Sequence, residues 1–233
     1  MKKMLMILTL IIFFTNQLSG QSMFDEGESL LLENRLSDAA VMFEGVIDQD
    51  PGNSAAYLYL AYIYEVKQDY NSAVMVLSRG LASVEQDKDK FYFNIANNYY
   101  KNGEYAEAAD MYSKALRSRS GFAEPYLNRA NCRVNTGEYS LAVRDYRLYL
   151  NMKPEDEQRT SIEKMISMLE LTIVEDEKRR EDEEQRRVTE AARQKALLDS
   201  VLNSLSNAGS DTTNLSAESE NIEDIELELD IED

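Results

Sequence analysis

The chain of 233 residues contains no histidine and no tryptophan, and its one cysteine is Cys132. These absences exclude histidine-based acid–base chemistry, Ser-His-Asp and Cys-His nucleophilic pairs, internal disulfides and most zinc sites. With 43 acidic against 25 basic residues the net charge is −18, which argues against nucleic acids and anionic membranes as partners, because both attract Lys and Arg. Composition therefore predicts a protein that is not an enzyme, with no catalytic residue, cofactor or metal.

The N-terminus predicts a secretory signal peptide over residues 1–20. Lys2 and Lys3 precede an apolar run over residues 4–14 that only Thr9 interrupts. A positive start followed by a short apolar run is typical of such peptides. The run is shorter than the roughly 20 residues that cross a bilayer. We expect an exported protein, periplasmic or secreted. The alternative is an uncleaved N-terminal anchor, which would then be its one membrane contact.

A pattern with a period of 34 residues recurs four times, over residues of about 20–53, 54–87, 89–122 and 123–156. Each of the last three copies opens on a large residue followed by a pair whose second member is alanine. These sets are Tyr57-Leu60-Ala61, Tyr92-Ile95-Ala96 and Tyr126-Arg129-Ala130. The first copy is weaker, with Met23 and Gly27 at these positions. A fixed period of this length predicts a stacked-repeat architecture.

Each copy predicts a helix, a turn and a second antiparallel helix. Apolar residues recur at i, i+3, i+4 and i+7, which is one face of an α-helix. Gly103-Glu104-Tyr105 interrupts the third copy, after which Ala108 and Tyr112 resume helical spacing. The alanines allow close helix approach, whereas Tyr57, Tyr92 and Tyr126 are expected to fill the gaps between helix pairs. Cys132 falls in a first helix, where we expect it to pack as a small apolar residue.

The four in-phase copies resemble the tetratricopeptide repeat (TPR) family, in an exported bacterial form. The resemblance implies an all-α solenoid of four helix-turn-helix repeats, with a concave groove lined by the first helix of each pair. Such grooves bind partner polypeptides. The groove residues that it implies are Leu58, Tyr62, Phe93, Asn94, Asn97, Tyr100, Asn128 and Asn131, with Glu65, Val66, Lys90, Lys101, Leu127 and Asn135 at further inner positions.

Two pairs of these groove asparagines are repeat-equivalent: Asn94 with Asn128, and Asn97 with Asn131. An amide side chain both donates to and accepts from a peptide backbone, so a row of them could hold an extended segment. The alternative is that they carry no ligand, because asparagine is common at both positions across the family. The family's carboxylate-binding subtype uses lysines and an arginine beside the asparagines. It is not indicated here, because the corresponding positions hold Phe24 and Glu28 in the first copy, with Lys90 as a lone match in the third.

Residues 157–205 predict a capping helix that continues as a charged helix. Apolar residues with helical spacing come first, followed by acid-then-base pairs four residues apart, such as Glu175 with Arg179 and Glu183 with Arg187. The helix ends on an apolar stripe within Leu197–Leu205. This extension could fold back on the repeats, or project and form a homodimer. The stripe is too short to establish a coiled coil.

Residues 206–233 predict a disordered acidic tail. Residues 207–233 hold ten acids and no base, and apolar and acidic residues alternate from Ile222 to Ile231. Like charges keep such a segment disordered in water. The alternative is a strand that adds to the sheet edge of a partner.

Two classes of function remain at this point. The first is a non-catalytic adaptor that binds partner proteins in its groove, with a role in cell-envelope assembly by analogy to its family. The second is a structural spacer that self-associates through the C-terminal helix.

Overall fold

The computed structural model describes residues 20–211, and side-chain surroundings through residue 206. This part of the chain is helical and contains no strand. The predicted signal peptide, except residue 20, and residues 212–233 of the predicted acidic tail lie outside it. The chain divides into two units, residues 1–174 and 175–233.

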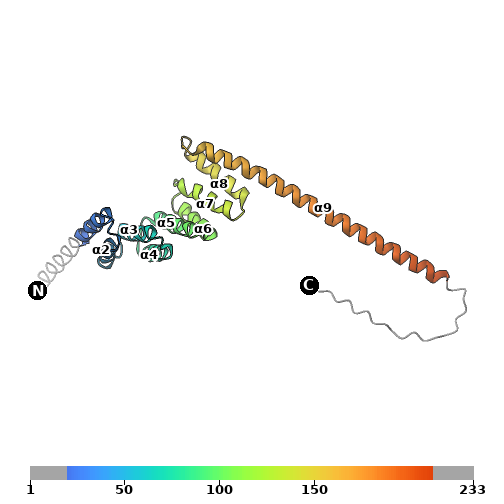
Figure 1. The fold of residues 1–233 in the computed structure, drawn as a ribbon, viewed down its shortest axis with the longest axis horizontal. Coiled ribbons are helices and arrows are strands. Elements are labelled where there is room, and N and C mark those ends of the chain that lie inside the picture. Colours follow the sequence, from blue (N-terminus) through green and yellow to red (C-terminus); the bar gives the residue numbers. More distant parts are fainter. Residues whose placement is uncertain (1–19, 212–233) are drawn as a thin grey trace, which may run out of the picture. The chain divides into compact units, whose positions relative to one another are not determined.

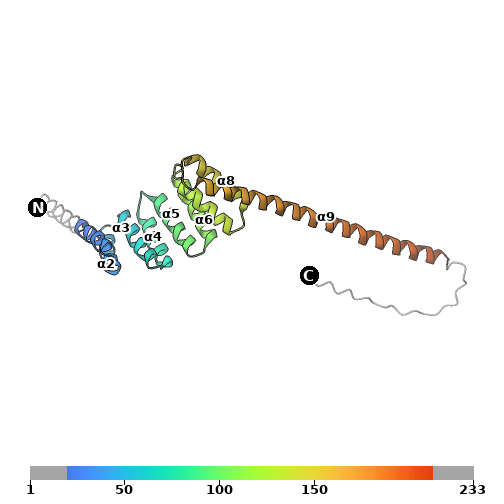
Figure 2. The same ribbon diagram turned by 45° about the horizontal axis from the view of Figure 1, so that its top comes forward.

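The first unit is a succession of antiparallel helix pairs (Figures 1 and 2). Between residues 36 and 152 each helix packs against the next one along the chain. The predicted all-α repeat solenoid is therefore confirmed. The pairs are residues 20–32 with α2 (Leu36–Gln49), α3 (Ser54–Val66) with α4 (Tyr70–Ser83), α5 (Lys88–Lys101) with α6 (Tyr105–Ser118), and α7 (Glu124–Asn135) with α8 (Tyr139–Met152).

The turn inside each pair uses the same backbone position in all four repeats. Asn34, Gln68, Gly103 and Gly137 have positive φ angles of 61°, 60°, 82° and 77°. A left-handed residue ends the first helix and reverses the chain, and glycine and asparagine tolerate this conformation best. The four turns are therefore geometrically alike although only two of them contain glycine.

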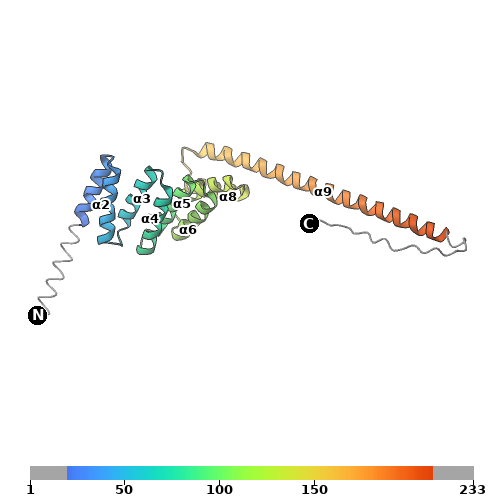
Figure 3. The same cartoon turned by 60° about the horizontal axis from the view of Figure 1, so that its bottom comes forward.

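Figure 3 shows α3, α4 and α5 following one another along the first unit. Aromatic rings fill the interface between α3 and α5. The buried rings of Tyr57 and Phe91 meet edge-on with centroids 6.2 Å apart. A side chain at Gly80 would lie 2.4 Å from Phe91 and 2.7 Å from Tyr57, so glycine leaves α4 room to approach. Tyr92, expected to fill this gap, is half-buried, because the residue before it faces the core in α5.

The fourth repeat replaces part of the apolar packing with an ion network. Asp145 on α8 is 1% exposed and receives Arg129 Nε at 2.7 Å and Nη2 at 2.8 Å. Arg133 also donates to Asp145, and Arg129 Nη1 donates to the hydroxyl of Ser113 on α6 at 2.8 Å. Burial lowers the pKa of Arg133. The network joins α6, α7 and α8, and so places α7.

Helix α9 (Arg159–Asp211) begins in the first unit. There Ile162, Ile166 and Leu169 are buried in one cluster with Tyr146 and Tyr149 of α8. The start of α9 therefore covers the apolar face that the fourth repeat would otherwise expose, as repeat arrays require at their ends.

In the second unit every residue from 177 to 206 is exposed. Its ion pairs are three residues apart, Asp176 with Arg179 at 2.7 Å and Glu184 with Arg187 at 3.0 Å. Arg179 and Arg187 thus pair differently from the spacing of four that we expected, because both spacings face each other on a helix. The helix also continues to Asp211, beyond the predicted end at residue 205. None of the described helices is both long and apolar enough to span a membrane.

We predict that Asp145→Asn lowers the free energy of unfolding by about 3 kcal/mol, because it leaves the partly buried Arg129 and Arg133 without a carboxylate. The triple variant Arg129→Ile, Arg133→Tyr, Asp145→Met copies Ile95, Tyr99 and Met111, the equivalent residues of the third repeat. It should lose less than about 1 kcal/mol or gain stability, because a packed apolar set avoids the desolvation of charges. Urea unfolding followed by circular dichroism measures both. A triple variant as unstable as Asp145→Asn would contradict this account.

Candidate functional site

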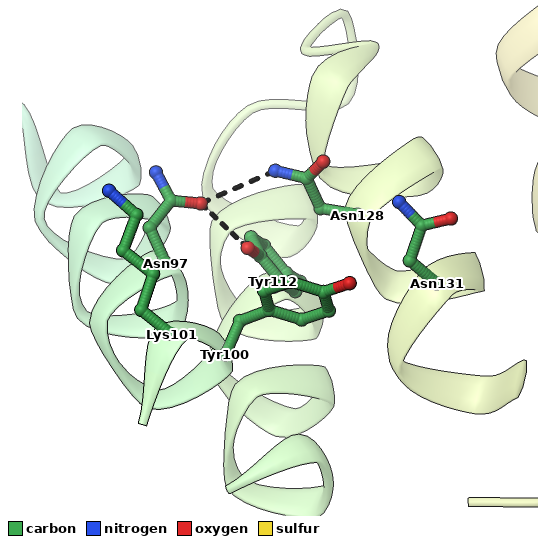
Figure 4. A pocket seen from close by; sticks show the side chains of 6 residues that line it. All are labelled: Asn97, Tyr100, Lys101, Tyr112, Asn128 and Asn131. Atoms are coloured by element: carbon green, nitrogen blue, oxygen red, sulfur yellow. Dashed lines mark hydrogen bonds between the residues drawn. The ribbon is translucent and has the colours of Figure 1, made fainter. Parts of the chain in front are cut away.

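A pocket of about 270 Å³ opens between α5, α6 and α7 (Figure 4). Its lining comes from the first helices of the third and fourth repeats, with Tyr112 contributed by α6. Four of the eight predicted groove residues meet here. The lining residues are Asn97, Tyr100, Lys101, Tyr112, Asn128 and Asn131.

Two repeat-equivalent hydrogen bonds orient the amides of this pocket. Tyr112 donates its hydroxyl to Asn97 Oδ1 at 2.6 Å, and Tyr146 donates to Asn131 Oδ1 at 2.6 Å. Asn128 Nδ2 also donates to Asn97 Oδ1, at 3.3 Å. Burial raises the pKa of Tyr112, and it raises the pKa of Tyr146 to about 12, so both hydroxyls stay protonated at neutral pH. Asn97 and Asn131 therefore use their carbonyl oxygens inside the protein, whereas their amide nitrogens donate to no other residue in the described part of the chain.

The one cation in the lining is neutralised by a neighbouring repeat. Lys101 Nζ lies 2.6 Å from a carboxylate oxygen of Glu65 on α3. Glu65 also receives Asn98 Nδ2 at 3.5 Å, and that nitrogen donates to the backbone oxygen of Asn94 at 2.9 Å. Asn98 is 1% exposed, and its Oδ1 has no hydrogen-bond partner within the described residues. The repeat pattern did not identify Asn98 as a site residue, because the equivalent positions of the neighbouring repeats hold Ile63 and Cys132 rather than asparagine.

Tyrosine rings supply the apolar part of the lining. Tyr100 packs edge-on against Tyr105 with centroids 5.3 Å apart, and burial raises the pKa of Tyr100. Cys132 is fully buried, and burial raises the pKa of its thiol to about 12. It therefore packs as an apolar residue rather than acting as a nucleophile. Tyr112 was expected only as a second-helix packing residue; its hydroxyl contact with Asn97 has no sequence signal.

The other four predicted groove residues lie outside this pocket. Leu58 and Phe93 are half-buried, and the Phe93 ring packs against Tyr112 and Phe122 at 5.8 and 4.8 Å. Asn94 donates Nδ2 to the backbone oxygen of Lys90 at 2.8 Å, in its own helix. Tyr62 is 51% exposed on α3. Their role in binding stays a prediction.

No group of three or more Cys, Asp or Glu side chains in the described part of the chain could hold a metal ion. The chemistry that this pocket offers is hydrogen bonding and ring packing.

Similar proteins are known for the repeats. Tetratricopeptide repeat protein 16 of Macaca fascicularis is 26% identical over 139 residues, which is 55% of this chain and 16% of that protein. A solved TPR protein from Parabacteroides merdae has a TM-score of 0.59 at 15% identity, covering 66% of this chain and 61% of that one. YrrB, a TPR protein described as having an unusual peptide-binding site, has a TM-score of 0.50 at 14% identity, covering 63% of this chain and 84% of that one.

These two structures share the fold at identities too low to show more. Two tetratricopeptide repeat models match the sequence itself, over residues 30–91 and 93–157, which together make up more than half of the chain. Because these matches coincide with the helix pairs of the structure, the chain belongs to the tetratricopeptide repeat family.

Proposed function

We propose that this protein is a non-catalytic adaptor that holds an extended segment of a partner polypeptide in the pocket between α5 and α7. The observation that carries the proposal is the pair of equivalent amides, Asn97 and Asn131, each held by a buried tyrosine with its nitrogen left for a ligand. Main-chain carbonyls are the most regular acceptors that a polypeptide offers. The peptide-binding site named for YrrB, which shares the fold, supports the same class of ligand.

The contacts favour recognition of the backbone over recognition of charge. Lys101 is already paired with Glu65, and the remaining lining residues are neutral. The half-buried ring of Tyr100 adds apolar surface for side chains of the ligand. Such a site holds segments through regular features that many sequences share, as an adaptor requires.

We predict that the double variant Asn97→Ala, Asn131→Ala binds a partner peptide about tenfold or more weakly, because two hydrogen bonds are lost at about 0.5–1.5 kcal/mol each. The matched control is Asn94→Ala, which removes an amide already bonded to its own helix. Peptides selected on an array with the wild-type chain, and then titrated by calorimetry, supply the measurement. Full affinity in the double variant, or equal loss in the control, would remove these amides from the site.

The cellular setting of this adaptor is proposed to be the cell envelope of a bacterium, as an exported factor in envelope assembly. The support is Lys2 and Lys3 followed by the apolar run of residues 4–14. Expressed in a bacterium, the full chain should appear in the periplasmic fraction, shortened by about 20 residues as for a cleaved signal peptide. Recovery of the full-length chain in the cytoplasmic fraction would contradict export, and recovery with the membrane would indicate an uncleaved anchor.

A second candidate function is a structural spacer that self-associates through α9. The observation that favours it is the apolar stripe near the end of that helix, whose side chains are between 48% and 67% exposed. Exposed apolar stripes at helical spacing pair readily with a second helix. The stripe consists of Leu197, Leu198, Val201, Leu202 and Leu205.

For this candidate, Leu198→Glu with Leu202→Glu should convert a dimer to a monomer, because charges replace the centre of the stripe. The control is Ser200→Glu with Asn203→Glu, two changes on another side of the same helix. Sedimentation velocity of the purified chain measures the state of each. A wild-type chain that is already monomeric at high concentration would eliminate the spacer.

A further inference from the structure

The amides of Asn97 and Asn131 are oriented in the same way in the pocket, each with its carbonyl oxygen bonded inside the protein. Asn97 and Asn131 are 34 residues apart, and each accepts a hydroxyl from the second helix of its own repeat. Asn97 Oδ1 is engaged a second time by Asn128 Nδ2. Rotating the Asn97 amide would bring two NH₂ groups together, so the observed orientation is the favoured one. A ligand group that faces the amide nitrogen of Asn97 or Asn131 is therefore an acceptor, such as a carbonyl oxygen.

Between these two donors the pocket offers flat ring surface. In Figure 4 the ring of Tyr100 is seen between the amides of Asn97 and Asn131. Tyr112 is 1% exposed, so its ring belongs to the core and Tyr100 alone supplies this surface. Tyr100 is half-buried, so part of its ring is available to a ligand. Aromatic rings of this kind favour compact apolar groups that lie flat against them, and the pyrrolidine ring of proline is one such group.

Charge does not select the ligand here. Lys101 lies against Glu65 at 2.6 Å, and no other charged side chain lines the pocket. An acidic or basic segment would therefore gain little from entering, and would have to shed water from its charges. The complementary segment is neutral.

We infer that the segment held in this pocket is proline-rich and binds as a polyproline II helix. An ordinary extended segment brings an N–H with every carbonyl, whereas proline offers the carbonyl alone. The polyproline II backbone makes no internal hydrogen bonds, so its carbonyls are free to accept from Asn97 and Asn131. Donor side chains beside aromatic rings are the chemistry by which proteins recognise such segments. The inference rests on the proposed adaptor function and specifies its ligand.

Tyr112 and Tyr146 act as positioning residues in this account. Neither hydroxyl needs to touch the ligand. Each holds an amide by its carbonyl oxygen, which leaves the amide nitrogen for the ligand. Replacing both by phenylalanine keeps the rings and lets Asn131 rotate, while Asn97 is held only by its longer contact with Asn128. The pocket would then accept backbone N–H groups as well, and its preference for proline would shrink.

The test uses the full chain and two fluorescein-labelled probes, decaproline and a neutral decamer of alternating alanine and serine, titrated by fluorescence anisotropy. We expect decaproline to bind at least about tenfold more tightly than the proline-free probe. Asn97→Ala with Asn131→Ala should weaken decaproline binding about tenfold, with Asn94→Ala as the unaffected control. Tyr112→Phe with Tyr146→Phe should narrow the ratio between the two probes by about threefold or more.

The outcomes separate this inference from the proposed function. If proline-free peptides bind as well as decaproline, and Asn97→Ala with Asn131→Ala weakens them, the adaptor stands and the preference for proline is wrong. Decaproline that binds equally well to that double variant sits elsewhere, which also overturns the inference. If neither probe nor any array peptide responds to the double variant, the inference and the proposed function fall together. Circular dichroism tests whether each variant is folded. If the tyrosine variant is unfolded, the asparagine variants alone test the inference.

Discussion

Every helix pair of this protein leaves an apolar face that it cannot bury alone, and the rest of the structure follows from that constraint. Each pair covers its neighbour, so the core runs from repeat to repeat and residues far apart in sequence rarely need to meet. Close approach is possible because small residues stand where helices cross, as Gly80 does beneath the rings of Tyr57 and Phe91. The start of α9 closes the series by covering the fourth repeat.

Within this regular frame the third and fourth repeats have diverged in a coordinated way. Ile95 and Met111 of the third repeat become Arg129 and Asp145 of the fourth, an apolar pair replaced by a charged one. A buried carboxylate is tolerable only because two guanidinium groups meet it. The network fixes α7 between α6 and α8, and α7 carries Asn128 and Asn131. The packing of the fourth repeat therefore also determines the geometry of the pocket.

The pocket connects the scaffold to its proposed ligand through the tyrosine hydroxyls. Tyr112 and Tyr146 are core residues whose rings are buried with the second helices, yet their hydroxyls reach the first helices and orient Asn97 and Asn131. Because this contact occurs in both repeats, the fold orients both amides in the same way, once in each period. A site built in this way suits a ligand that itself has a repeating backbone.

The period of 34 residues, the alanines of the helix contacts and the helical spacing were sufficient to predict the all-α solenoid, its turns and the helix that carries Asn97. The helical spacing and the turns are local, because each depends on residues within one or two turns of a helix, and the period shows that the same unit recurs along the chain. The sequence also pointed to the amides, yet it did not distinguish Asn97 and Asn131 from Asn94, whose nitrogen is spent on its own helix. The orientation of the amides, the neutralisation of Lys101 by Glu65 and the burial of Asn98 were decided by tertiary structure alone. Each depends on a contact between helices, and spacing along the chain does not specify which side-chain atom meets which.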